Sequence, residues 1–128
     1  MIDGRVIAVI DDDESVRAAL ASLLRSTGLA VNLFHGAEEF LRSPWGPDAA
    51  CLIVDVRMPG VSGLDLQELL VARGHLLPII FISAHADAGE RDRALAAGAL
   101  GILSKPFAAD ELFQYIDCAL KQDKLFAN

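Results

Sequence analysis

Short apolar runs alternate with amphipathic segments along the whole chain. The apolar runs show no strict alternation of apolar and polar side chains, and they cover residues 6–10, 30–34, 52–54, 79–82 and 100–103. Continuous apolar strands of this kind are typical of a parallel sheet that is covered on both faces. We therefore predict a strand at each of these places.

The segments between the apolar runs have the spacing of helices. Leucines and alanines recur three or four residues apart in segments at 14–27, 37–42, 62–74, 87–98 and 112–120. Two of these segments begin with a capping-box pattern, Ser62 with Asp65 and Asp87 with Glu90, which places a bonding side chain at the first turn of a helix. The sequence thus predicts five helices that alternate with the five strands.

This alternation predicts an α/β domain. Right-handed crossovers place helices on both faces of a parallel sheet, which gives an open three-layer sandwich. A chain of 128 residues has the size of one domain. We expect the domain to cover 1–122, with 123–128 as a C-terminal tail or the start of a linker.

The net charge of −7 disfavours polyanions as binding partners. A chain of this charge is repelled by nucleic-acid phosphates and by anionic membranes, so we expect no nucleic-acid contact by this chain itself. Its uncharged stretches are too short to span a membrane, and no basic and apolar leader follows Met1. We expect a soluble, cytoplasmic protein in which Cys51 and Cys118 are buried or half-buried thiols.

Polar residues follow four of the five predicted strands. In chain order they are Asp11, Asp12, Asp13 and Glu14, then Asp55, then Ser83, then Ser104 and Lys105. Ligands of open parallel sheets bind outside the carboxyl ends of the strands. We therefore expect several acids, a hydroxyl and an amine to meet at one edge of the sheet.

These residue types suit a hard cation and a phosphoryl group. Mg²⁺ prefers one or two carboxylates together with waters and phosphate oxygens. A carboxylate can attack phosphorus and form an acyl phosphate, and positive charge from a metal ion and a lysine then stabilises the transferring group. A neutral hydroxyl can donate to a phosphoryl oxygen. Each part of a phosphoryl-transfer site therefore has a candidate in this sequence.

Four sequence elements together resemble the receiver domain of bacterial response regulators. In chain order they are VIDDDESVR, LIVDVRMPGVSGLDL, IIFISAHAD and LSKPF, and they span almost the whole chain. The stretches RMPGVSGLDLQELL and PIIFISAHAD are most similar to receivers linked to LuxR-type helix-turn-helix domains. The resemblance implies a flavodoxin-like (βα)5 fold with a five-stranded parallel sheet in the order 2-1-3-4-5.

The resemblance also implies the ligands of a metal site. Asp55 matches the aspartate that accepts phosphate, and Asp12 matches the carboxylate that binds Mg²⁺ or Mn²⁺ directly. Asp11 matches its neighbour, which acts mostly through a metal-bound water. The carboxylate of Asp55 and the backbone carbonyl of Arg57 would complete the protein ligands.

The remaining site residues lie on the fourth and fifth strand ends. Lys105 matches the lysine that reaches the acids and then the phosphoryl group, and Ser83 matches the switch hydroxyl. The bond before Pro106 is expected to be cis, which aims the lysine inward. Two departures stand out: Ile102 replaces the switch aromatic of the family, and the fourth helix, AGERDRALAAG, is more charged than in LuxR-linked relatives.

Several polar residues have simpler explanations. Asp13 and Glu14 are expected to cap or charge the first turn of the first helix and to face solvent. Asp11 and Asp12 could do the same, but metal binding is the favoured interpretation. His85 could accept a proton or contact a kinase, but an exposed loop histidine is the favoured interpretation. We expect no site role for His35, His75 and Trp45.

The resemblance implies a signalling module rather than an enzyme with turnover on a foreign substrate. A sensor histidine kinase or a phosphotransfer protein would phosphorylate Asp55. Phosphorylation would then switch the face made by the fourth helix, fifth strand and fifth helix, which could also form a homodimer. The output would be a process such as transcription, through an attached or partner domain.

Other classes stay open. A pseudo-receiver would have the fold and dock partners without ever being phosphorylated. An aspartyl-phosphate hydrolase would need a second acid two residues after the nucleophile, where this chain has Arg57. An FMN carrier of flavodoxin type would need a phosphate loop rich in serine, threonine and glycine rather than in acids.

Overall fold

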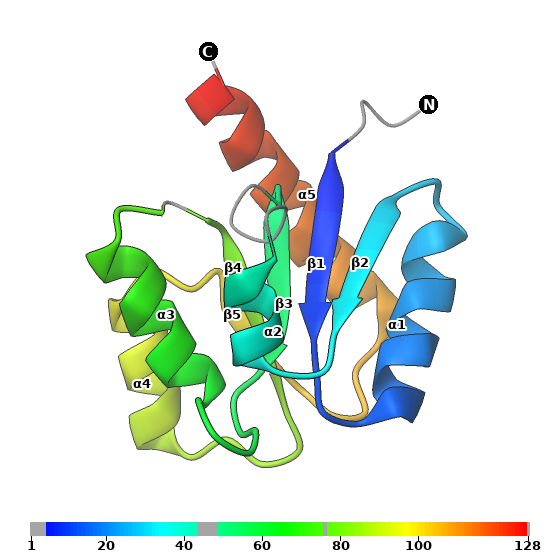
Figure 1. Ribbon diagram of the computed structural model, residues 1–128. Coiled ribbons are helices and arrows are strands. Elements are labelled where there is room, and N and C mark those ends of the chain that lie inside the picture. Colours follow the sequence, from blue (N-terminus) through cyan, green and yellow to red (C-terminus); the bar gives the residue numbers. More distant parts are fainter. Residues whose placement is uncertain (1–4, 44–48, 76, 128) are drawn as a thin grey trace.

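The computed structural model describes residues 5–43, 49–75 and 77–127 (Figure 1). Within these ranges strands and helices alternate as predicted. The strands are β1 (Val6–Ile10), β2 (Ala30–Phe34), β3 (Cys51–Asp55), β4 (Ile79–Ser83) and β5 (Gly101–Ser104). The helices are α1 (Glu14–Arg25), α2 (Ala37–Arg42), α3 (Gly63–Ala72), α4 (Ala88–Ala96) and α5 (Ala109–Ala127).

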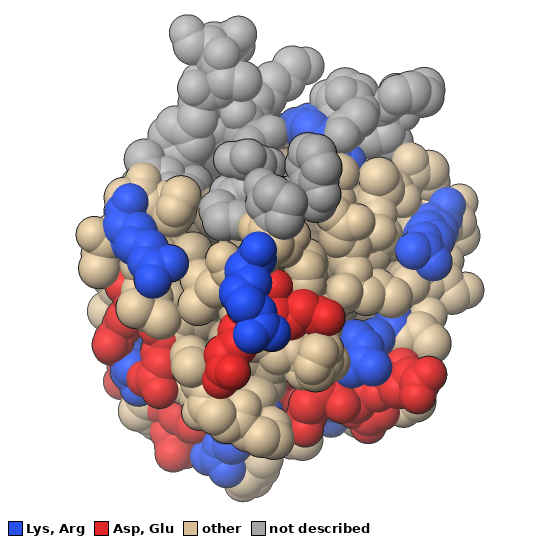
Figure 2. Space-filling model, in the orientation of Figure 1, with Lys and Arg blue, Asp and Glu red and all other residues tan. Residues whose placement is uncertain are grey.

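The strands form one parallel sheet in the order β2-β1-β3-β4-β5, so the predicted fold class is confirmed. Helices α1 and α5 cover one face, and α2, α3 and α4 cover the other (Figure 1). All strands end at the same edge of the sheet, at the bottom of the view. In the same orientation, acidic side chains gather over the lower half of the molecule (Figure 2).

The central strand β3 shows why the sequence pattern is continuous rather than alternating. Leu52 and Val54 pack in the cluster under α2, α3 and α4, whereas Cys51 and Ile53 pack in the cluster under α1 and α5. Successive side chains of a strand point to opposite faces, and here both faces are covered. Every residue of β3 is therefore buried.

The predicted capping patterns are present at the starts of two helices. Ser62 accepts a hydrogen bond from the backbone N–H of Asp65 at 3.1 Å, and α3 begins at the next residue. Asp87 and Glu90 form a complete capping box, in which each side chain accepts the backbone N–H of the other residue. These bonds satisfy donors that a helix leaves unpaired at its first turn.

The C-terminal part bears on two expectations. Helix α5 continues to Ala127, so the expected tail at 123–128 is helical over its described residues. The stretch contains neither glycine nor proline, and nothing in it opposes helix formation. Cys118 is exposed, which makes the prediction of a buried or half-buried thiol wrong there, whereas Cys51 is buried. Cys118 lies off the buried stripe of Leu112, Ile116 and Ala119.

Trp45 lies outside the described residues. Among the helices that are described, none has both the length and the apolar character needed to cross a membrane.

Candidate functional site

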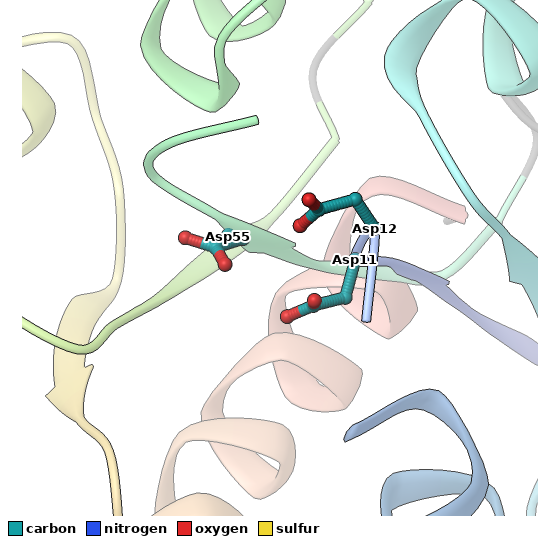
Figure 3. A group of neighbouring side chains, drawn as sticks. All are labelled: Asp11, Asp12 and Asp55. Carbon is teal, nitrogen blue, oxygen red and sulfur yellow. The ribbon is translucent and has the colours of Figure 1, made fainter. Parts of the chain in front are cut away.

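Three carboxylates converge at the carboxyl edge of the sheet. Asp11 and Asp12 directly follow β1, and Asp55 is the last residue of the neighbouring strand β3. The register pairs Ile10 with Val54, so Asp11 and Asp55 come next to each other one residue later. One oxygen from each carboxylate lies within 4.8 Å of the others, and Asp11 and Asp12 both point toward Asp55 (Figure 3).

The three acids differ in burial. Asp11 is fully buried and Asp55 is 8% exposed, whereas Asp12 is exposed to solvent. Like charges so close together repel one another, and burial raises the cost of each charge. This cluster of three carboxylates therefore needs a positive charge nearby.

Lys105 supplies part of that charge. Its Nζ lies 2.8 Å from Asp55 Oδ2 and 3.0 Å from Asp11 Oδ2. Burial alone would lower the pKa of the Lys105 ammonium, but hydrogen bonds to Asp55 and Asp11 and the charges of these two carboxylates outweigh burial and raise that pKa. The lysine is therefore protonated at neutral pH and joins the ends of β1, β3 and β5.

The lysine is placed by backbone contacts of its own. Its N–H donates to the carbonyl of Ser83 at 2.8 Å, which fixes the residue after β5 against the end of β4. The peptide bond between Lys105 and Pro106 is cis.

Backbone donors hold the two buried carboxylates in place. The N–H of Arg57 donates to Asp55 Oδ1 at 3.0 Å, and the N–H of Asp13 donates to Asp11 Oδ1 at 2.9 Å. Both oxygens of each carboxylate thus have a donor, one from the backbone and one from Lys105. Arg17 adds a further contact, because its guanidinium donates to the backbone carbonyl of Asp11 at 2.6 Å. These hydrogen bonds therefore fix the orientation of both buried carboxylates.

Helix α3 begins in close contact with Asp55. The N–H of Gly63 donates to the carbonyl of Val56 at 3.0 Å. A Cβ on Gly63 would overlap the backbone oxygen of Asp55, so only glycine allows this approach. The glycine in the sequence Val61-Ser-Gly63 is thus a requirement of the site's geometry.

Ser83 and Ile102 lie on the fourth and fifth strands, where the sequence places them. Ser83 ends β4, is buried, and its Oγ accepts the N–H of His85 at 3.1 Å. Ile102 of β5 lies opposite Phe81 of β4 in the register and packs in the core under α2, α3 and α4. A buried aliphatic side chain cannot exchange a ring or hydroxyl between pocket and surface.

Asp13 and Glu14 have the helix-start roles that were predicted. Asp13 is the N-cap of α1, and its carboxylate accepts the N–H and the hydroxyl of Ser15, which lowers its pKa. Glu14 follows as an exposed acid in the first turn. The histidines lie outside the acid cluster: His85 is exposed, and His35 pairs with Glu39 on the surface.

The acid cluster fits a hard divalent cation. Its donors are oxygens of three carboxylates, the ligand type that Mg²⁺ and Mn²⁺ favour. Among the described residues, it is the group of acids, histidines and cysteines whose ligand atoms lie close enough together to bind a metal ion. Asp12, whose carboxylate is exposed, leaves the cluster open toward solvent.

Sequence reasoning missed the contact between Arg57 and Glu90. The guanidinium of Arg57 forms a two-pronged ion pair with Glu90 of α4, with Nη2 2.9 Å from Oε1 and Nε 3.1 Å from Oε2. The two residues are 33 positions apart, and each lies in a segment that has another local role. Nothing in the sequence pattern pairs them.

Comparison with known proteins agrees with this geometry. The family model of the response regulator receiver domain matches residues 7–117. The chain is 47% identical over 116 residues to the response regulator protein TodT of Pseudomonas putida, covering 91% of this chain and 51% of TodT. It is 40% identical over 122 residues to the transcriptional regulatory protein TdiR of Thauera aromatica, covering 95% of this chain and 54% of TdiR.

A solved structure supports the same assignment. The response regulator StyR matches with a TM-score of 0.87 and 42% identity, over 96% of this chain and 62% of that one. The chain spans about half the length of the curated relatives it matches. The match covers nearly every element of the sheet and all of the strand-end residues described above, and the chain belongs to the response regulator receiver domain family.

Proposed function

We propose that this chain is a phospho-acceptor receiver of a two-component phosphorelay. Asp55 takes a phosphoryl group from the phosphohistidine of a sensor kinase or a phosphotransfer protein. The observation that carries the proposal is the position of Lys105 Nζ, 2.8 Å from Asp55 and 3.0 Å from Asp11, beside a third carboxylate. A purely structural strand end does not need this arrangement of three acids and one protonated amine.

Asp55 would act as the nucleophile. A carboxylate oxygen attacks phosphorus, the bond between phosphorus and the histidine nitrogen breaks, and that nitrogen leaves with the electron pair. Lys105 stabilises the ionised carboxylate before the attack. After the attack, the negative charge lies on the phosphoryl oxygens. The ammonium group of Lys105 would then contact these oxygens.

A divalent cation, Mg²⁺ or Mn²⁺, would be held by Asp11, Asp12, Asp55 and the backbone carbonyl of Arg57. When bound, the ion supplies positive charge beside the phosphoryl oxygens. The N–H of Arg57 already fixes the loop on Asp55. The same loop would therefore orient the nucleophile and contribute a metal ligand.

Ser83 would read the phosphorylated state. Its oxygen accepts the N–H of His85, so the hydroxyl hydrogen can turn toward a phosphoryl oxygen. The phosphoryl group then acts as a ligand that favours one of two arrangements of the α4, β5 and α5 face. Because Ile102 is aliphatic and buried, this readout would depend on Ser83, Lys105 and the loops rather than on an aromatic rotamer.

The proposed output requires a domain other than this receiver. The relatives named above are regulators, one of them transcriptional, and this chain matches about half of each. We therefore propose a receiver over 1–122 that controls an attached or partner domain, with a phosphorylation-dependent homodimer through α4, β5 and α5 as one route. The chain itself, at a net charge of −7, would make no nucleic-acid contact and would be cytoplasmic.

The hydrolase alternative is not favoured. An aspartyl-phosphate hydrolase needs an acid two residues after the nucleophile, whereas this position holds Arg57, whose side chain is engaged with Glu90. The chain would thus promote its own phosphorylation and hydrolysis without turnover of a foreign substrate.

The test is phosphorylation by acetyl phosphate with and without Mg²⁺. We expect wild type to gain one phosphoryl group only with Mg²⁺, as seen by intact-mass spectrometry and phosphate-affinity gels. Asp55→Asn should gain none, and Asp65→Asn, which alters an exposed aspartate of α3, should behave like wild type. Equal behaviour of wild type and Asp55→Asn would reject phosphorylation at Asp55 and leave a docking module as the function.

A further inference from the structure

Helix α4 is attached to the domain mainly through polar contacts. Ala94 is its one buried residue. Arg93 forms ion pairs with Asp65 and Glu68 of α3, at 3.0 Å and 2.7 Å. The side chain of Gln67 donates to the carbonyl of Ala94 at 3.0 Å. The ion pairs of Arg93 lie at the protein surface, where each such pair is individually weak.

The N-terminal end of α4 is tied to the loop that carries the acceptor. Glu90 lies in its first turn and binds Arg57 through two parallel hydrogen bonds, the strongest arrangement available to an arginine and a carboxylate. The backbone N–H of Arg57 donates to Asp55 Oδ1 at 3.0 Å. One residue therefore contacts the acceptor through its backbone and α4 through its side chain.

Glu90 is the fixed partner of this pair. Its Oε1 also accepts the N–H of Asp87 at 3.1 Å, and its own N–H donates to Asp87 Oδ1 at 2.7 Å. The side chain of Glu90 is 20% exposed, whereas that of Arg57 is 60% exposed. If Arg57 leaves, Glu90 keeps its capping contacts, so the helix loses its tie to the loop but not its cap.

Arg57 also lies in the field of the acceptor. The charges of Glu90, Asp87 and Asp55 all favour the protonated guanidinium. Phosphorylation replaces the single negative charge of the Asp55 carboxylate by a phosphoryl group with a charge of about −2, so the acceptor gains about one negative charge. The acceptor site would then attract the exposed guanidinium of Arg57 more strongly than before phosphorylation.

We propose that the Arg57–Glu90 ion pair is a latch that couples the acceptor to α4. While Asp55 is unmodified, Glu90 holds Arg57 and thereby the first turn of α4 against the acceptor loop. A phosphoryl group on Asp55 competes for Arg57, opens the pair and releases that end of α4. The inference rests on the proposed phosphorylation of Asp55.

Linkage makes the latch testable. If a phosphoryl mimic opens the pair, then removing the pair in advance must favour binding of the mimic. Glu90→Gln leaves Arg57 available and should tighten binding. Arg57→Gln removes the group that the mimic attracts, so Glu90→Gln should have no further effect in that background. Arg93→Gln is the matched control, because it cuts a contact of α4 that does not reach the acceptor loop.

The experiment measures the binding of beryllofluoride with Mg²⁺ by fluorine NMR. We expect Glu90→Gln to bind about two- to fivefold more tightly than wild type, the range that an exposed ion pair supports. The gain should vanish in Arg57→Gln, and Arg93→Gln should match wild type. Unchanged affinity in Glu90→Gln, a gain that persists without Arg57, or an equal gain in Arg93→Gln would each overturn the latch.

Amide exchange of the α4 segment gives a second measurement. Without beryllofluoride, exchange in α4 should be faster in Glu90→Gln than in wild type, and beryllofluoride should bring wild type to the level of the variant. If wild type binds no beryllofluoride, the proposed function fails and the latch fails with it. If wild type binds and α4 exchange does not change, the latch alone is rejected.

Discussion

Lys105 Nζ lies 2.8 Å from Oδ2 of Asp55, although 50 residues separate them in the sequence. The same nitrogen contacts the fully buried Asp11 at 3.0 Å. The positive charge of Lys105 thus compensates the negative charges of the two buried carboxylates. Without Lys105, these two charges stay close together and lose their cationic partner. A buried charge that loses its partner is costly because water cannot replace the lost contact.

Lys105→Met should therefore destabilise the domain when divalent cations are absent. We expect a loss of about 1–3 kcal/mol in the free energy of unfolding, below the value for a fully buried pair because the lysine is partly exposed. Urea denaturation with EDTA measures this loss. Added Mg²⁺ should recover part of it, since the cation can take over the compensation of the acids.

The control for this prediction is Lys121→Met, which removes an exposed lysine of α5. It should change stability little, and Mg²⁺ should stabilise it no more than wild type. A Lys105→Met protein as stable as wild type in EDTA would show that solvent already screens the acids.

Gly63→Ala tests the close approach of α3 to the acceptor. A Cβ there would overlap the backbone oxygen of Asp55, and backbone cannot move aside as a side chain can. We expect a loss of about 2–3 kcal/mol, near the upper end of overpacking costs, together with weaker Mg²⁺ binding because the end of β3 is displaced. Urea denaturation and Mg²⁺ titration measure the two effects.

Gly89→Ala is the matched control, because a Cβ on this glycine of α4 meets its nearest atom, Asp87 Oδ1, at 3.4 Å, an ordinary contact. Alanine favours the helix over glycine, so this variant should be as stable as wild type or more stable by up to about 1 kcal/mol. If Gly63→Ala behaved like Gly89→Ala, the contact with Asp55 would not constrain the loop.

The fold followed from the sequence because each strand is short, apolar and bounded by a helix signal. In β3, the residues that face opposite cores are equally apolar, and this pattern allows little besides a doubly covered parallel sheet. The end of α5 was harder to predict. Its apolar stripe ends at Leu120, but good helix formers without glycine or proline carry the helix on to Ala127.

The candidate site was predictable only in part. Its acids, lysine and serine stand at strand ends, and topology brings strand ends together whatever the side chains do. The pair of Arg57 and Glu90 depends instead on the distance between a loop and a helix start, which no periodicity encodes. Arg17, which holds the carbonyl of Asp11, was likewise indistinguishable from a solvent-facing helical arginine.

The contacts between α3 and α4 should make the free energy of unfolding depend on pH in the acidic range. The hydrogen bond from Arg93, followed by one from Ser62, lowers the pKa of Asp65 in the folded protein. A lowered folded pKa gives stability that is present above the unfolded value of about 3.9 and is lost as pH falls through the folded pKa. Asp65→Asn should thus be less stable than wild type at neutral pH, and the difference should shrink below about pH 4.

Urea midpoints from neutral pH down to about pH 3 test this dependence. In an Arg93→Gln background the effect of Asp65→Asn should be smaller and less dependent on pH, because the main partner is gone. A difference that is constant with pH would assign the effect of Asp65→Asn to the first turn of α3 rather than to its ionised contact with Arg93.

The two thiols should react at very different rates in the native protein. Cys118 is exposed on α5, whereas Cys51 is fully buried in the central strand. A thiol reagent such as dithionitrobenzoate should modify one cysteine rapidly in native protein and both in urea. Cys118→Ser should remove the fast phase and leave the slow one. Two fast reactions in wild type would mean that β3 opens locally.

The slow reaction of Cys51 then reports on opening of the whole sheet, because β3 lies between β1 and β4 and opens only when the core does. Ligands that bind only the folded protein reduce this opening by mass action. Mg²⁺ should therefore slow the labelling of Cys51 in Cys118→Ser, and the effect should be weaker when Asp12→Asn removes an exposed carboxylate of the cluster. If Mg²⁺ slowed both proteins equally, Asp12 would not be one of the ligands.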